Sequence, residues 1–174
     1  MSRHIIRFPL AALIGAILMT MACCTHRSAA WPMLSAADSL MESRPDSALA
    51  ILRSVDPSAL PSGEESARYA LLMSMALDKN YVDTTTFDIL QPAIDYYLRK
   101  GTPDERLRTL YYQGRIYKNA HDYDKALQAF TRAIQSTPVY SDSLTMARVL
   151  YASGNTYREY YDYNNSLKSF TEAG

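Results

Sequence analysis

Residues 107–138 are LRTLYYQGRIYKNAHDYDKALQAFTRAIQSTP, and part of this pattern returns 40 residues later, in the stretch YASGNTYREYYDYNNSLKSF at 151–170. Three residues hold the same relative places in the two stretches: Gly114, Tyr117 and Phe130 in the first, and Gly154, Tyr157 and Phe170 in the second. Self-similarity at a period of this length is typical of repeat proteins, in which each copy is one supersecondary unit. The stretch therefore predicts a fold built from stacked copies of one unit.

The chain before residue 107 has the apolar spacing of helices rather than the alternation of strands. In residues 35–55, Pro45 divides the apolar pattern into two short helices, because proline disfavours a helical residue before it and suits a first helical turn. Residues 64–80 form the next predicted helix, which is apolar on several sides and is expected to be well buried. No stretch has the pattern of a strand, so the sequence predicts an all-α fold.

Two helix starts are predicted from residues that cap or break helices. A threonine is expected to cap a helix over residues 87–100, which Pro92 should kink, or whose start it should move to Gln91. Asp104 is expected to cap the helix that follows.

Residues 107–140 resemble a tetratricopeptide repeat, a helix-turn-helix unit of about 34 residues with large, small and aromatic residues at fixed offsets. The matching residues are Leu110, Gly114, Tyr117, Ala126, Phe130, Ala133 and Pro138, and Gln113 departs from the usual leucine. A second, incomplete copy covers residues 147–174 with Leu150, Gly154, Tyr157, Phe170 and Ala173, and departs at Ser153 and Ser166. Residues 34–100 have the rhythm of helical pairs without this signature.

The resemblance implies antiparallel helix pairs stacked as a right-handed solenoid over residues 34–174, with three to four pairs. Gly114 and Ala126 are expected where the two helices of one pair cross, and Tyr117 and Phe130 between neighbouring pairs. Because the last copy is incomplete, the chain is interpreted as a fragment of a longer protein or as one whose last helix frays.

The first 22 residues have the layout of a signal peptide. A short basic segment precedes an apolar run at 8–22 that ends at two cysteines, and this run is short for a membrane-spanning helix. The segment resembles the lipobox of bacterial lipoproteins, which implies lipidation at Cys23, with Cys24 as the alternative. An ordinary signal peptide or an uncleaved anchor are the other interpretations. Residues 23–33 would then form a tether to the membrane.

The chain as a whole resembles exported tetratricopeptide lipoproteins of Bacteroides-type bacteria. The stretches that carry this resemblance are ADSLMESRPDSALAIL, ARYALLMSMALDKNY and YYQGRIYKNAHDYDKALQAF. It implies a location in the cell envelope. In that group acidic residues after the lipidated cysteine direct export to the surface, and because CTHRS contains none, a periplasm-facing location is favoured.

Composition and motifs indicate binding rather than catalysis. The chain has 18 basic and 18 acidic residues, and without the two arginines of the first 22 residues the balance is about −2, which is no footprint of nucleic-acid binding. No metal, cofactor, phosphate-loop or nucleophile motif is present, so no metal, no cofactor and no enzyme activity are predicted. Of the three histidines, His121 is expected to be a solvated turn residue, and Asp78, Asp83 and Asp88 are expected to act as caps.

The resemblance implies that the first helix of each pair lines a concave face. The residues on this face would be Arg108, Tyr111, Arg115, Lys118 and Asn119 in one repeat, and Arg148, Tyr151, Asn155, Arg158 and Glu159 in the next. Arginine and tyrosine are favoured in interfaces, so the stripe predicts a groove for an acidic or C-terminal peptide. The alternative is a solvated polar face that binds nothing.

The sequence therefore predicts a lipid-anchored protein- or peptide-binding scaffold outside the cytoplasm. One alternative is the sensory input portion of a truncated transmembrane signalling or transcription regulator. A weaker alternative is a nutrient-binding lipoprotein.

Overall fold

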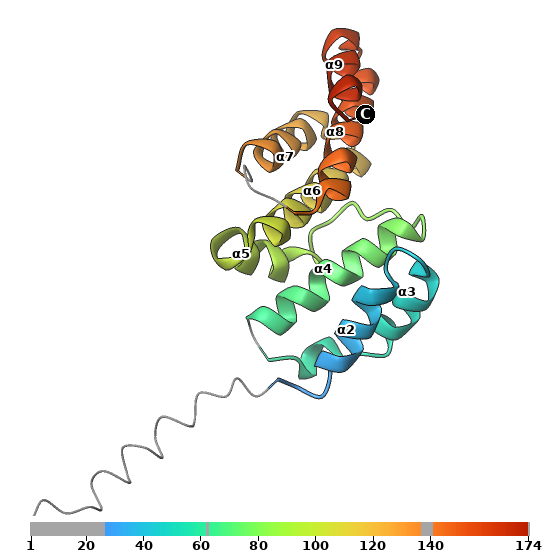
Figure 1. The fold of residues 1–174 in the computed structure, drawn as a ribbon, viewed down its shortest axis with the longest axis vertical. Coiled ribbons are helices and arrows are strands. Elements are labelled where there is room, and N and C mark those ends of the chain that lie inside the picture. Colours follow the sequence, from blue (N-terminus) through green and yellow to red (C-terminus); the bar gives the residue numbers. More distant parts are fainter. Residues whose placement is uncertain (1–26, 62, 137–140, 174) are drawn as a thin grey trace, which may run out of the picture.

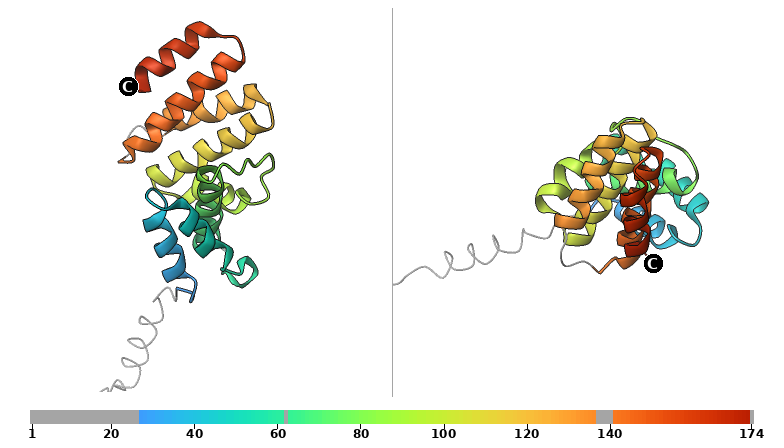
Figure 2. Two further views of the ribbon diagram at one scale, coloured as in Figure 1. Left: turned by 90° about the vertical axis from the view of Figure 1, so that its right-hand side faces the viewer. Right: turned by 90° about the horizontal axis from the view of Figure 1, so that it is seen from above.

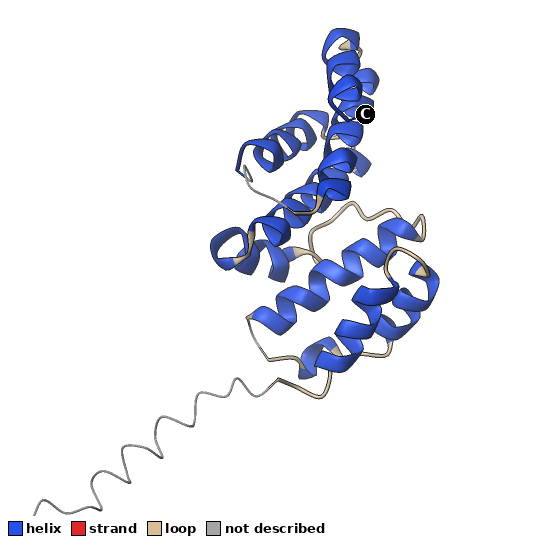
Figure 3. Cartoon of the chain, viewed as in Figure 1, coloured by secondary structure: helices blue, strands red, loops and turns tan. Residues whose placement is uncertain are grey.

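The computed structural model describes residues 27–61, 63–136 and 141–173, which contain eight α-helices, one 3₁₀ helix and no strand (Figures 1 and 3). The helices are α2 (Trp31–Leu40), α3 (Pro45–Arg53), η2 (Pro57–Ala59), α4 (Glu64–Lys79), α5 (Gln91–Lys100), α6 (Pro103–Asn119), α7 (Tyr123–Ser136), α8 (Ser143–Glu159) and α9 (Tyr163–Ala173). The prediction of an all-α fold is confirmed. The predicted signal peptide, Cys23, Cys24 and Pro138 lie outside the described residues.

The helices form four pairs, α2–α3, α4–α5, α6–α7 and α8–α9, which follow one another along the molecule (Figure 2). The first helix of each pair also packs against the first helix of the next, so that α2, α4, α6 and α8 contact one another in order. The division of residues 35–55 at Pro45 is confirmed, and α4 is buried along most of its length as predicted. Among the described helices none is long and apolar enough to cross a membrane.

Three of the first helices end in the same turn, at a spacing of 40 residues. Tyr81, His121 and Tyr161 each have a positive φ, of 59°, 59° and 63°. After each of them, the next amide donates to a carbonyl of the last helical turn, as in the bond of 2.9 Å from Asp122 to Tyr117. This is the Schellman motif, which normally has glycine at the left-handed position. The α4–α5 pair therefore shares this turn with the two pairs that follow it, although it lacks the sequence signature.

Phe130 packs inside its own helix pair. The ring of Phe130 is fully buried and lies so close to Gly114 that a Cβ atom there would fall within 3.0 Å of three ring carbons. The missing side chain of Gly114 opens a socket for the ring within the pair, a contact that the sequence did not predict for Phe130. Tyr117 does bridge pairs, since its ring centroid lies 4.9 Å from that of Phe87, which precedes α5.

The start of α6 differs from the prediction, and the start of α5 decides between two predicted alternatives. Thr102, not Asp104, caps α6, because the Thr102 side chain accepts from the amide of Glu105 while the Glu105 side chain accepts from the amide of Thr102. This reciprocal capping box satisfies two free amides, whereas Asp104 lies in the first turn and binds Ser141 and Asp142. Helix α5 begins at Gln91, which is the second of the two outcomes expected from Pro92.

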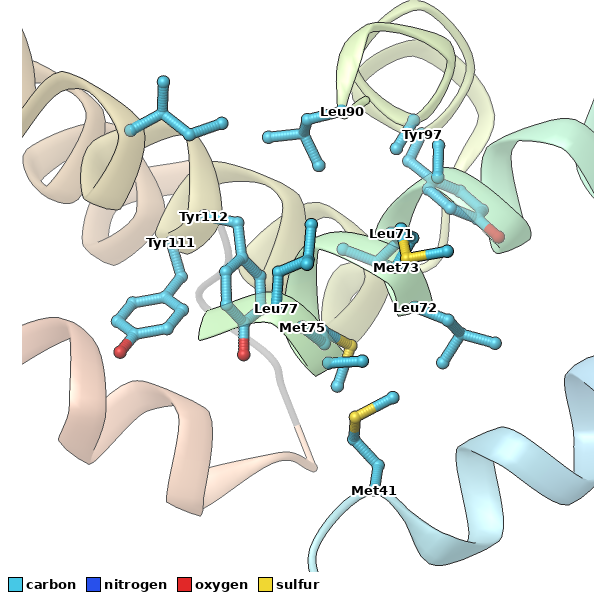
Figure 4. Packing of buried hydrophobic residues seen from close by; sticks show 14 of the residues in the cluster. Met41, Leu71, Leu72, Met73, Met75, Leu77, Leu90, Tyr97, Tyr111 and Tyr112 are labelled. Atoms are coloured by element: carbon cyan, nitrogen blue, oxygen red, sulfur yellow. The ribbon is translucent and has the colours of Figure 1, made fainter. Parts of the chain in front are cut away.

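The core runs through the stack, with α4 at its centre (Figure 4). Leucine and methionine side chains of α4 lie between Met41 of the first pair and Tyr112 of α6, and all of them are buried. Trp31 is the first residue of α2, and its ring lies between the guanidinium groups of Arg27 and Arg68, at 3.9 and 4.4 Å from its centroid.

Candidate functional site

A groove of about 360 Å³ lies along α6 and α8. Its lining is Tyr111, Arg115, Lys118, Leu144, Ala147, Arg148, Tyr151, Ala152, Asn155 and Ala173. Six of the nine residues predicted for a peptide-binding groove are among them, and none of the described residues that line it is acidic. The groove therefore brings together most, but not all, of the predicted stripe.

Arg148 is bound to an acidic residue far away in the chain. Its guanidinium donates two hydrogen bonds, of 3.0 and 2.8 Å, to the carboxylate of Glu42, which follows α2. Lys79 of α4 donates to the same carboxylate at 2.8 Å. The hydrogen bonds from Arg148 lower the pKa of Glu42 to about 2, against the opposing effect of burial, and Lys79 adds to this shift. Glu42 is therefore a carboxylate of the chain itself that Arg148 and Lys79 hold beside the groove.

Arg115 lies deeper and has an acidic partner on α4. Its Nη2 atom is 2.8 Å from Asp78, and its Nη1 atom is 3.4 Å from the hydroxyl of Tyr111. Burial raises the pKa of Asp78, although Arg115 opposes this effect. The Nε–H of Arg115 is buried and has no hydrogen-bond partner among the described residues. Asp78 was predicted to be a cap, but the α4–α6 contact makes it an ion-pair partner instead.

Lys118 also has a partner, because its Nζ atom lies 2.8 Å from Glu159 of α8. The three cations that line the groove, Arg115, Lys118 and Arg148, are thus matched by three acids that lie beside the lining. A ligand carboxylate would have to exchange with one of these acids, and Glu42 is the most exposed of the acids that pair with groove arginines.

The other three predicted residues lie outside the groove. Arg108 forms an ion pair with Asp142 and lines a second cavity of about 260 Å³ with Trp31, Asp38 and Arg68. Asn119 donates to the carbonyl of Thr84 at 3.2 Å and so holds the loop before α5. Arg158 is exposed near the end of α8.

Sequence reasoning missed Glu42 and Asp78 as parts of the site, since no local pattern connects them to α6 or α8. The arginines do follow a pattern in the sequence, because Arg68, Arg108 and Arg148 are spaced by 40 residues. All three form ion pairs in the structure. Among the described residues, no group of three or more metal-binding side chains is assembled.

Comparison with known proteins gives one result. Residues 107–138 match the family model described as tetratricopeptide repeat. No curated protein and no solved structure gives a significant match to the chain. Repeats of this family are typically non-catalytic and bind other proteins or peptides, so the matched segment, which covers most of α6 and all of α7, indicates a protein-interaction scaffold.

Proposed function

We propose that the chain is a lipid-anchored scaffold whose groove along α6 and α8 binds a peptide of another protein. The four pairs would form a right-handed solenoid, with the first helices on its concave side. The observation that carries the proposal is the groove itself, since three cations and two tyrosines line it and no acidic residue of the described part of the chain does. Tyrosine and arginine are the side chains that most often dominate binding energies in interfaces.

The peptide that fits this groove has an acidic residue or a free C-terminal carboxylate. Arg148 presents a planar fork that binds a carboxylate through two parallel hydrogen bonds, and Glu42 already uses this geometry. Because the Glu42 side chain is about half exposed, water can solvate it when a ligand carboxylate replaces it. The exposed ring of Tyr151 would cover the apolar part of the same peptide.

We further propose that Cys23, or alternatively Cys24, anchors the chain in the cell envelope, facing the periplasm. The support is the apolar run that ends at these cysteines, and α2 begins shortly after them. Inhibition of the lipoprotein signal peptidase, or the double change Cys23→Ala and Cys24→Ala, should release or mislocalise the protein. Unchanged membrane association in fractionated cells would contradict the anchor.

The groove is tested by selecting peptides from a phage-displayed library against the whole chain. Peptides with an acidic residue should be enriched, and Arg148→Gln should weaken them about tenfold or more, as loss of a charge-paired anchor does. The matched control is Arg158→Gln, on the same helix but outside the groove, which should leave binding unchanged. Glu42→Gln should tighten binding, because it removes the competing carboxylate. If the arginine changes have equal effects, or Glu42→Gln weakens binding, the groove is not the site.

A further inference from the structure

The second cavity, of about 260 Å³, lies among α2, α4, α5 and α6, and no described residue lines both it and the groove. Its lining includes two acidic residues from the first turns of two helices, Glu64 of α4 and Glu105 of α6. Leu71, Leu72 and Met75 of α4 also line it, and all three are buried. The cavity therefore combines carboxylates with an apolar wall.

Tyr97 lines the same cavity with a hydroxyl group that has no hydrogen-bond partner among the described residues. The residue is 2% exposed, and a hydroxyl buried to this extent is normally hydrogen-bonded. Burial raises the pKa of Tyr97, and Glu105 and Glu64 raise it further, while Arg68 opposes them. These charged side chains, which line the cavity, are thus close enough to act on the hydroxyl, and the hydroxyl is free to accept a hydrogen bond from a ligand.

The two carboxylates lack a positively charged partner. Glu64 forms no hydrogen bond and no ion pair with a described residue. Glu105 accepts from Thr102 through its Oε2 atom in the capping box, which leaves its Oε1 atom without a partner in the described part of the chain. Both carboxylates can therefore accept from a cation inside the cavity.

The arginines of the cavity are already matched by other acids. Arg68 pairs with Asp38 at 3.1 Å, and Arg108 pairs with Asp142. With these two pairs set aside, the charge that remains in the described lining is negative. A cationic ligand is therefore favoured over an anionic one.

We infer that this cavity binds an alkylammonium group, supplied by a small primary amine or by a lysine side chain. An ammonium group has three hydrogen-bond donors and no acceptor. The carboxylates of Glu64 and Glu105 and the hydroxyl of Tyr97 provide three acceptors for it. The buried leucine and methionine side chains of α4 would contact the alkyl chain.

The probes are n-butylammonium, which represents a small amine, and Nα-acetyl-lysine amide, which represents a lysine within a peptide. Isothermal titration calorimetry of the whole chain in uncharged detergent at neutral pH should show saturable binding of at least one probe. Butanol and butyrate, which lack the positive charge, should not bind at the same concentrations. Tighter binding of the acetylated lysine would identify a lysine side chain as the ligand, and the reverse order would identify a small amine.

Three variants test the acceptors one at a time. Tyr97→Phe and Glu64→Gln should each weaken binding about tenfold or more, because one removes an acceptor of the charged group and the other removes the charge that pairs with it. Glu105→Gln should also weaken binding, and it retains the capping box because glutamine serves at that position too. The matched control is Asp46→Asn, at an exposed acid in the first turn of α3 outside the cavity lining, which should leave binding unchanged.

Circular dichroism and urea unfolding check that the variants fold. Because the Tyr97 hydroxyl has no partner in the described chain, Tyr97→Phe should leave the free energy of unfolding unchanged, so that weaker binding reports on the ligand. The inference is overturned by the absence of saturable binding of both amines, or by full binding to the Tyr97→Phe and Glu64→Gln chains. Binding of butyrate or butanol as tight as that of n-butylammonium would also overturn it, because the carboxylates would then not select the ligand.

Discussion

Replacing Gly114 by alanine should destabilise the fold, although alanine favours helices. The new Cβ atom would lie within 3.0 Å of three carbons of the Phe130 ring, which is fully buried and cannot move away. Overpacking of this kind costs about 1–3 kcal/mol, and the gain in helix propensity returns about 0.5–1 kcal/mol. We therefore expect a net loss of about 1–2 kcal/mol in the free energy of unfolding.

The matched control is Gly154→Ala, at the equivalent site. Its Cβ atom would lie 2.7, 2.8 and 3.1 Å from ring carbons of Phe170, but Phe170 is only half-buried and can shift toward solvent. The net effect there should be close to zero, within about 0.5 kcal/mol. Urea unfolding followed by circular dichroism measures both values. Equal destabilisation by the two changes, or a stabilising effect of Gly114→Ala, would refute the explanation of the glycine as a socket for the ring.

Three further predictions concern helix ends and the charge pair at the groove. Thr102→Ala should cost about 1 kcal/mol in thermal or urea unfolding because α6 loses its capping box, whereas Thr102→Ser should cost little. Tyr81→Gly should stabilise the chain by about 1 kcal/mol, since Tyr81 is 95% exposed and has a positive φ; a loss of stability would show that the ring has a structural contact. Because the folded-state pKa of Glu42 is lowered from 4.5 to about 2, its contribution is present above pH 4.5 and is lost as the pH falls toward 2. Glu42→Gln should remove that part of the acid destabilisation, by less than about 1 kcal/mol because the carboxylate is half exposed, and identical pH profiles would contradict the assignment.

The helical pairs were predictable because their determinants are local. Gly114, Tyr117, Ala126 and Phe130 form a pattern that can be found in a single stretch, and Pro45 and Pro92 mark helix starts by their own geometry. The likeness of α4–α5 to the later pairs was harder to see, since Ser74 occupies the position of Gly114 and the turn residue Tyr81 is not a glycine. The feature that α4–α5 shares with those pairs is the backbone conformation of this turn, which the residue types do not indicate.

The arrangement of charge could not be predicted, because it depends on contacts between distant helices. Arg148 and Glu42 are 106 residues apart, and only the stacking of four pairs brings them together. The predicted stripe placed Arg108, Arg115 and Arg158 together because the resemblance implies that first helices line one concave face. The structure separates them, since Arg108 pairs with Asp142 and Arg115 with Asp78, whereas Arg158 is exposed outside the groove.

The arginine that recurs every 40 residues forms an ion pair with a different acid in each helix pair, and this difference can give the chain its specificity for a ligand. Arg68 pairs with Asp38 on the preceding first helix, and Arg108 with Asp142 at the cap of the following one. Arg148 reaches past both α4 and α6 to Glu42, whose side chain is the most exposed of these three acids. Packing residues such as Gly114 and Phe130 recur as Gly154 and Phe170 because they join the two helices of one pair, but an arginine on the surface can bind whatever carboxylate lies within reach. Of the three arginines, Arg148 is therefore the one whose partner in the chain a ligand can replace at the lowest cost in desolvation. Groove binding should depend on the step in which a ligand carboxylate takes the place of Glu42 on Arg148.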